Sequence, residues 1–376
     1  MPEQNPVRER LVVVSNRLPF ALKRDDGDAW TATRSAGGLA TAMHPLLKRT
    51  GGIWIGWPGD SSDPNDPGRQ HALEGQAREG FHVVELPEDL VAGFYEGFSN
   101  GTLWPLFHHF PSRLDFQPEH WADYQKANEI FRDAVLAHLQ PNDLVWVHDY
   151  QLMLLSQLLR EARPDVRVGF FLHIPFPSSS VFRVLPRGDE LLSGLLGADY
   201  LAFHTHSDVQ HFRNCILRRL GLASQMDRVE LGGRSVRLEA VPISIDPQSF
   251  AKLLQDDPEM PARLQALRSR YAGRRLLVAV DRLDYTKGIP NRFRTFDRLL
   301  KTFPYLRGKV VLIQVAVPSR ENVESYRELG QQTDELVGQI NGRWGTPDWT
   351  PLVYIKRGLP AAELAALYAA ADVGWV

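Results

Sequence analysis

The sequence contains a single cysteine, Cys215, among its 376 residues, and this excludes an internal disulfide. It shows no signal peptide and no apolar run long enough to span a bilayer. Neither sign of charge dominates, because 43 Lys and Arg stand against 45 Asp and Glu, which gives a formal net charge of −2. These absences predict a cytoplasmic protein without nucleic-acid or membrane partners. Any cation that binds a ligand must therefore act locally.

Hydrophobic residues make up 43% of the chain, enough for substantial cores. Short apolar, β-branched runs alternate with helical patterns. The runs lie at residues 11–15, 53–57, 82–86, 144–147, 166–173, 200–204, 236–243, 276–280, 310–317 and 352–355. This alternation predicts an α/β fold with two doubly wound parallel sheets, in which ligands bind beyond the carboxyl ends of the strands.

Proline punctuation in residues 242–247 (PISIDP) falls between two series of strands and helices. It predicts an N-terminal domain of residues 1–245 and a C-terminal domain of residues 246–376. Residues 372–376 (DVGWV) begin what should be a buried strand. We therefore expect the second domain to be incomplete at its C-terminus.

Two strand-end loops carry the groups that hold phosphate. The first comprises RLVVVSNRLPF, with Arg17, and SAGGLATAM, with Gly37 and Gly38; the second is LLVAVDRLDYTKGIPNRF, with Arg282 and Lys287. Each passes from an apolar run through a polar loop into a helix N-terminus, where backbone N–H groups and a cation surround an anion. Together the loops predict an enzyme that binds two phosphorylated substrates. Taken singly, the glycine pair need bind nothing, and Arg282 and Lys287 could be ordinary surface cations.

Other candidate residues each leave two interpretations open. Residues 95–110 (YEGFSNGTLWPLFHHF) have no clean period, so Phe98 and Trp104 suit either a core or a sugar site. Asp149 in WVHDYQL can orient a hydroxyl nucleophile or cap a helix. His173 in FFLHIPFP can contact a sugar or be a satisfied core histidine, and Arg320 in PSRE follows a strand where a ligand contact is expected.

A metal site is not predicted. His204, His206 and His211 lie close in sequence, but no carboxylate or cysteine pattern with zinc spacing accompanies them. A solvated turn and helix start is the favoured interpretation.

Several long and unusual segments carry a family resemblance: VVVSNRLP, SAGGLA, FSNGTLWPLFH, VWVHDYQLMLL, GFFLHIPFPS, DRLDYTKG, PSRENV and INGRWGTPDWTPL. Through them the chain resembles the trehalose-6-phosphate synthases of glycosyltransferase family 20. The resemblance implies a GT-B architecture, with an acceptor-side and a nucleotide-sugar-binding domain facing across a cleft. It also implies metal-independent transfer of glucose from UDP-glucose, a co-substrate, to glucose 6-phosphate. The product would be α,α-trehalose 6-phosphate with retained configuration, and no cofactor would be required.

The resemblance also implies roles for individual residues. Arg17 and Arg320 would clamp the acceptor phosphate, with Tyr95 and Trp104 beside it; Asp149 would orient the acceptor; His173 would contact the donor glucose; Arg282 and Lys287 would bind the donor diphosphate, which the backbone at Gly37 and Gly38 would approach. This assignment separates Gly37 from Arg17, which the loop pattern alone gives to one phosphate.

Two alternatives remain. A glucosylglycerol-phosphate synthase would keep the chemistry and use glycerol 3-phosphate as the acceptor. The second alternative is a truncated, non-catalytic homologue that binds ligands or partners. It is considered because family members continue beyond the equivalent of residues 372–376 into a segment that contacts the donor. A homo-oligomer stays open, because the sequence does not determine the oligomeric state.

Overall fold

The computed structural model describes residues 9–24, 29–34, 47, 50–320 and 323–376. The chain divides into two compact units, residues 1–245 (unit 1) and 246–376 (unit 2). The division lies inside the proline-punctuated segment of residues 242–247.

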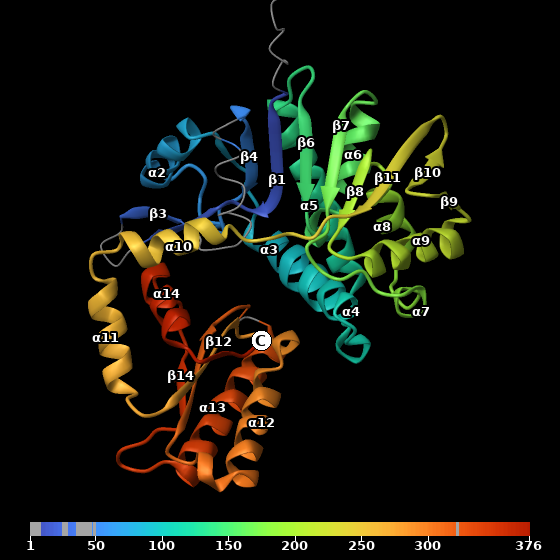
Figure 1. Cartoon of the computed structure of the whole chain (residues 1–376). Coiled ribbons are helices and arrows are strands. Elements are labelled where there is room, and N and C mark those ends of the chain that lie inside the picture. Colours follow the sequence, from blue (N-terminus) through green and yellow to red (C-terminus); the bar gives the residue numbers. More distant parts are fainter. Residues whose placement is uncertain (1–8, 25–28, 35–46, 48–49, 321–322) are drawn as a thin grey trace, which may run out of the picture. The chain divides into compact units, whose positions relative to one another are not determined.

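Unit 1 is built on a nine-stranded sheet with the order β5-β4-β1-β6-β7-β8-β11-β10-β9 (Figure 1). The strands are β1 (Leu11–Arg17), β4 (Ile53–Trp57), β5 (Phe81–Val83), β6 (Leu144–His148), β7 (Arg167–Phe171), β8 (Tyr200–Phe203), β9 (Ser224–Gln225), β10 (Arg228–Leu231) and β11 (Arg234–Ala240). All pairs from β5 to β11 are parallel, and β10 pairs antiparallel with both of its neighbours. Val12, Val13 and Val14 are fully buried, so both faces of β1 are covered, as a continuous apolar run predicts.

Helices connect these strands. They are α2 (Pro67–Arg78), α3 (Glu88–Val91), α4 (Trp104–Phe107), α5 (Pro118–His138), α6 (Leu155–Ala162), α7 (Ser179–Phe182), α8 (Gly188–Leu195) and α9 (His206–Leu220). The hydroxyl of Thr205 and the carboxylate of Asp208 form a capping box that starts α9, and Gly221 ends the helix in the left-handed region. A hairpin of β2 (Phe20–Arg24) and β3 (Trp30–Arg34) forms a separate small sheet.

A π-helix, Ala92–Leu103, precedes α4. Its hydrogen bonds run from residue i to i+5, so its side chains follow neither the helical nor the strand period. This explains why residues 95–110 show no clean pattern. Two glycines let the π-helix pack closely on α5: a Cβ at Gly93 would lie 1.7 Å from an Asp123 carboxylate oxygen, and one at Gly97 would lie 2.5 Å from the His120 ring.

One face of the sheet at β6, β7 and β8 borders a cavity of about 700 Å³ within unit 1. Its walls include Trp146, Phe171 and Tyr200, together with Val241 and Ile243 after β11. His148 and His173 also line it, so both predicted strand ends adjoin this space.

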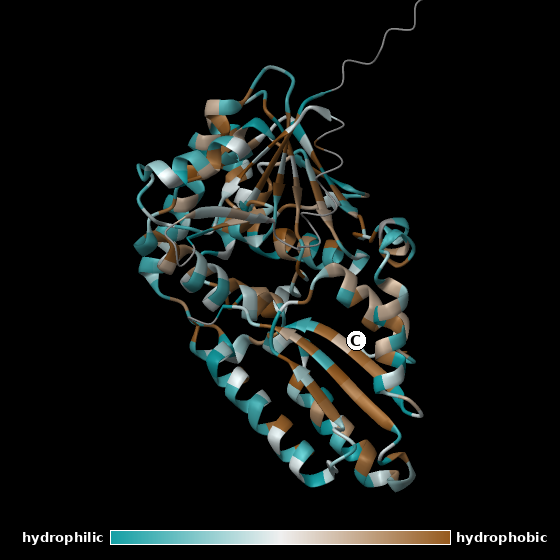
Figure 2. Ribbon diagram, turned by 90° about the vertical axis from the view of Figure 1, so that its left-hand side faces the viewer, coloured by the Kyte–Doolittle hydropathy of each residue, from teal (hydrophilic) through white to brown (hydrophobic). Residues whose placement is uncertain are grey.

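Unit 2 contains a four-stranded parallel sheet with the order β14-β13-β12-β15. Its strands are β12 (Arg275–Arg282), β13 (Val310–Val317), β14 (Leu352–Ile355) and β15 (Val373–Gly374), and its helices are α10 (Pro247–Asp256), α11 (Met260–Arg270), α12 (Ile289–Thr302), α13 (Glu324–Trp344) and α14 (Ala361–Ala370). The long strands of the unit are largely hydrophobic (Figure 2), and helices contribute further residues to its core. On α12, Ile289, Phe293, Phe296 and Leu300 recur at helical spacing and are all buried, which attaches this face of the helix to the sheet.

Candidate functional site

The strand order of unit 1 reverses between β1 and β6. From β1 the chain proceeds to β4 and β5 on one side, and from β6 to β7 and β8 on the other. Ser15 pairs with His148 in this register, so Arg17, the last residue of β1, and Asp149, which follows β6, lie at the carboxyl ends of adjacent strands. A parallel sheet binds its ligands at such a switch point. The structure therefore brings these two predicted residues to the expected edge.

Arg17 is held by aromatic rings and by a glycine. Its guanidinium carbon lies 4.5 Å from the centroid of the Trp57 ring, and Tyr95 meets the same ring edge-on at 6.2 Å. Gly59, with φ of 84°, lies directly against the guanidinium, since a Cβ there would come within 2.2 Å of Arg17 Cζ. The Arg17 side chain is exposed by its accessible surface, and the protein groups around it lower its pKa by partial desolvation, which Tyr95 partly offsets. An arginine remains charged in this situation. A fixed cation next to Tyr95 is suited to a phosphate.

Asp149 has an unusual backbone. Its φ of 75° and ψ of 170° place it in a region that residues other than glycine rarely occupy. Its N–H donates to the Phe171 carbonyl at 2.8 Å, and its Oδ1 accepts from the His173 N–H at 3.1 Å. The carboxylate makes no capping hydrogen bond to the 3₁₀ turn Tyr150–Leu152, which removes the capping interpretation. Strain of this kind is concentrated at functional sites.

His173 is hydrogen-bonded to a second histidine. Its Nε2 lies 3.0 Å from Nδ1 of His148, the last residue of β6. Burial, followed by the nearby His204, lowers the pKa of His173 to about 4. Burial and then His173 hold the pKa of His148 well below its usual range. Both rings are consequently neutral near pH 7, so His173 can offer a neutral imidazole to a sugar hydroxyl.

Trp104 and Phe98 are both buried, which favours the packing interpretation for each. Phe98 is inaccessible and packs on Trp121 and Tyr124 with ring centroids 5.1 and 4.7 Å apart. Trp104 is 4% exposed and packs on Tyr150 at 5.6 Å. A contact between Trp104 and the acceptor stays a prediction.

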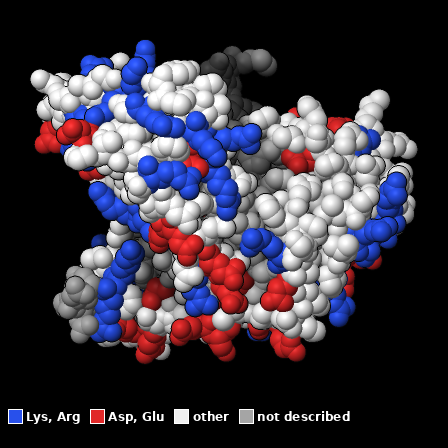
Figure 3. Space-filling view, turned by 90° about the horizontal axis from the view of Figure 1, so that it is seen from below, with Lys and Arg blue, Asp and Glu red and all other residues white. Residues whose placement is uncertain are grey.

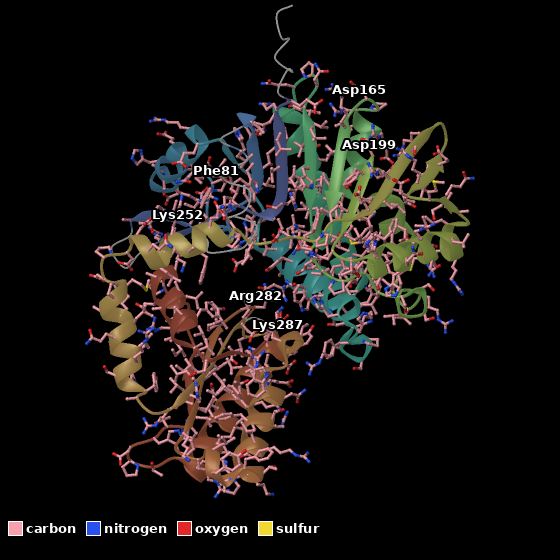
Figure 4. All side chains as sticks on the ribbon, in the orientation of Figure 1. Phe81, Asp165, Asp199, Lys252, Arg282 and Lys287 are labelled. Atoms are coloured by element: carbon pink, nitrogen blue, oxygen red, sulfur yellow. The ribbon has the colours of Figure 1, made fainter. Side chains whose placement is uncertain are left out.

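In unit 2, Arg282 ends β12 and Lys287 ends the following 3₁₀ turn, Tyr285–Lys287. Both side chains are exposed, and they lie close to one end of the unit 2 sheet (Figure 4). Gly288, with φ of 63°, joins the turn to α12, and Pro290 stands in the first turn of that helix. Strand order also reverses here, because β13 and β14 lie on one side of β12 and β15 on the other. Two cations before a helix N-terminus are suited to an anion.

Arg320 follows β13 in a left-handed conformation, with φ of 53°. It is almost fully buried and forms an ion pair of 3.1 Å with Asp284, which is fully buried. Its guanidinium also donates to the Tyr326 hydroxyl. These contacts hold the Arg320 side chain in place, in the same unit as Arg282 and Lys287.

Gly37 and Gly38 lie outside the described residues. Within the described ranges, no three His, Cys, Asp or Glu side chains gather in a way that could hold a metal ion. None of the described helices combines the length and apolar character that crossing a membrane requires.

A profile of glycosyltransferase family 20 matches residues 9–376. The chain belongs to glycosyltransferase family 20. It is 42% identical to an α,α-trehalose-phosphate synthase (UDP-forming) of Dictyostelium discoideum, over 98% of this chain and 50% of that protein. It is also 42% identical to the corresponding synthase of Schizosaccharomyces pombe, over 97% of this chain and 71% of that protein. The chain therefore spans between half and three quarters of the length of these relatives.

Solved structures of the family agree with this fold. The synthase of Burkholderia xenovorans in complex with glucose-6-phosphate is 34% identical, with a TM-score of 0.85, over 98% of this chain and 78% of that one. The E. coli protein bound with UDP-2-fluoro glucose is 33% identical, with a TM-score of 0.85, over 97% and 77%. The predicted fold class, two doubly wound parallel-sheet domains of the GT-B type, is confirmed.

The sequence analysis did not identify three residues that contact predicted site residues. They are Gly59, which lies against Arg17, His148, which is hydrogen-bonded to His173, and Asp284, which pairs with Arg320. Asp284 lies inside DRLDYTKG and His148 directly precedes Asp149, so both were close to recognised motifs. Gly59 carried no signal, because its role arises only where its loop meets β1.

Proposed function

We propose that this family 20 chain transfers glucose from UDP-glucose to glucose 6-phosphate, forming α,α-trehalose 6-phosphate and UDP with retained configuration. The observation that carries the proposal is the exposed pair of Arg282, the last residue of β12, and Lys287, in the turn before the N-terminus of α12. The named activity of its relatives and the ligands in their solved structures support the same conclusion.

The mechanism depends on stabilising the negative charge of the leaving group. Departure of UDP leaves an oxocarbenium-like sugar and places negative charge on the diphosphate. Arg282 and Lys287 stabilise that charge without a metal ion, aided by the α12 N-terminus. The leaving phosphate accepts the proton of the acceptor hydroxyl, which attacks from the same face, so a carboxylate nucleophile on the enzyme is not required.

The remaining residues position the two sugars. The family resemblance assigns Arg17 beside Tyr95, and Arg320 paired with Asp284, to the phosphate of glucose 6-phosphate. It assigns Asp149 to the orientation of the anomeric hydroxyl. His173, neutral near pH 7, donates a hydrogen bond to the donor glucose. UDP-glucose is a co-substrate, and no cofactor takes part. The face shown in Figure 3 carries both Lys and Arg and Asp and Glu side chains, so it is not of one charge.

The test is release of UDP by the purified 376-residue chain from UDP-glucose, with and without glucose 6-phosphate and with a chelator present. Acceptor-dependent release that the chelator leaves unchanged is expected. Glycerol 3-phosphate serves as a competing acceptor. Absence of release from a chain shown to be folded, or equal release without an acceptor, would contradict the proposal.

A further inference from the structure

Asp284 lies in the turn after β12, and its side chain is fully buried. A buried carboxylate is costly unless its oxygens are fully hydrogen-bonded and its charge is balanced. Each of its oxygens accepts two hydrogen bonds, and the two oxygens serve different segments of unit 2.

The first oxygen shapes the diphosphate turn. Oδ1 accepts from the backbone N–H and from the hydroxyl of Thr286, both at 2.9 Å. The Asp284 carbonyl accepts from the Lys287 N–H at 3.0 Å, which closes the 3₁₀ turn. The backbone that carries Lys287 is therefore folded around Asp284.

The second oxygen holds the segment after β13. Oδ2 accepts from Arg320 Nη1 and from the Tyr326 hydroxyl, both at 3.1 Å. Burial raises the pKa of Tyr326, so its hydroxyl keeps its proton and can donate to the carboxylate. Arg320 also donates to that hydroxyl, which makes a closed triangle of Asp284, Arg320 and Tyr326.

We infer that Asp284 is a positioning residue that sets one cation for each substrate: Lys287 for the donor diphosphate through Oδ1, and Arg320 for the acceptor phosphate through Oδ2. The inference rests on the proposed function for the identity of the two ligands. A single rigid carboxylate fixes the distance between two cation-bearing segments that are 33 residues apart in sequence. Preorganisation of this kind avoids reordering flexible side chains when the substrates bind.

The two oxygens can be tested separately. Thr286→Val removes a donor to Oδ1 and leaves the Asp284–Arg320 pair, whereas Tyr326→Phe removes a donor to Oδ2 and leaves the turn. Asp284→Asn weakens both. Asp297→Asn is the matched control, because Asp297 also accepts hydrogen bonds in unit 2, from Arg343 and Trp344 of α13, but it lies on α12 away from both segments.

Calorimetric titration with UDP and with glucose 6-phosphate is the first measurement. We expect Thr286→Val to weaken UDP binding severalfold with glucose 6-phosphate unchanged, and Tyr326→Phe to do the reverse. Asp284→Asn should weaken both by roughly tenfold or more, as expected for hydrogen bonds to a charged group. In turnover assays the same split should appear in the two KM values. A purely structural role would instead lower stability and leave both affinities equal to those of Asp297→Asn.

Amide hydrogen exchange of the unliganded chain is the second measurement and needs no substrate. Thr286→Val should speed exchange in residues 283–288 only, Tyr326→Phe in residues 317–320 only, and Asp284→Asn in both. If either single variant loosened both segments, or Asp284→Asn loosened neither, the inference would be overturned. A wild-type chain that bound neither ligand would refute the proposed function, while the exchange pattern would still decide the role of Asp284. Should Asp284→Asn fail to fold, the two single variants still give the decision.

Discussion

His148 Nδ1 and His173 Nε2 lie 3.0 Å apart at the carboxyl ends of β6 and β7 and share one hydrogen bond. One ring must donate and the other accept, so the pair cannot hold its geometry with both rings protonated. Burial lowers the pKa of both rings and so favours the neutral form of each. The contact thus links acid sensitivity to a residue assigned to the donor sugar.

Acid should destabilise unit 1 before ordinary carboxylates titrate. The folded pKa of His173, about 4, lies below its usual value of 6.5, so the unfolded chain binds more protons between these values. The stabilisation is complete above pH 6.5 and is lost as the pH falls towards 4. We expect the free energy of unfolding to decline between pH 6.5 and 5 by at most about 1.4 kcal/mol per pH unit for each histidine.

Urea unfolding across pH 5 to 8 measures this decline. His148→Asn should reduce the decline by the share of His148, because an amide can keep the hydrogen bond to His173 but does not titrate, whereas His173 still does. Exposed His206, at the start of α9, provides the control variant His206→Ala, which should keep the wild-type profile. A profile unchanged by His148→Asn would show that the pair does not set the acid response.

Replacing Asp149 by glycine should be less harmful to stability than replacing it by alanine. Both changes remove the carboxylate, but only alanine keeps a Cβ at φ of 75°. Strain of about 1 to 3 kcal/mol is relieved by glycine, and part of that gain is lost to its backbone entropy, about 0.5 to 1 kcal/mol. We expect Asp149→Gly to be the more stable by about 1 kcal/mol, by the difference of these values.

Activity should follow a different order at this position. Asp149→Gly and Asp149→Ala should lose acceptor-dependent UDP release to a similar degree, because neither orients the acceptor hydroxyl. Chemical denaturation and the release assay on the two variants separate the effects. Equal stability of the two would argue that the backbone at Asp149 is unstrained.

Gly59→Ala should disturb Arg17 from outside the phosphate site. The added methyl would come within 2.2 Å of Arg17 Cζ, and φ of 84° is unfavourable for alanine. The guanidinium must leave its place over Trp57, so we expect the KM for glucose 6-phosphate to rise more than the KM for UDP-glucose. Gly75→Ala in α2 is the control, because a Cβ there meets nothing within 4 Å. That variant should keep wild-type kinetics and gain about 0.5 to 1 kcal/mol of stability.

The sequence predicts strands well where both faces are buried, because such a strand is a continuous apolar run. Residues 11–15 of β1 and 310–317 of β13 are examples. It misses elements whose pattern is mixed: the β2–β3 hairpin, the short β9 and β10, and the π-helix Ala92–Leu103. Motif residues at strand ends were identifiable because parallel strands align their carboxyl ends. Partners such as Gly59 and His148 were not, because their roles depend on contacts between segments that only the folded chain brings together.

Arg282→Ala should lower turnover by about two powers of ten. Removing one preorganised cation from a departing diphosphate costs on the order of 3 kcal/mol in the transition state, and the loss should appear mainly in kcat. Arg275→Ala is the matched control, since Arg275 begins the same strand and forms an exposed pair with Asp372, which contributes little to stability. Steady-state UDP release from both variants at saturating substrates makes the comparison. If Arg282→Ala and Arg275→Ala both retained most of the wild-type kcat, Arg282 would not be the group that stabilises the departing diphosphate. Lys287 would then be the first residue to substitute.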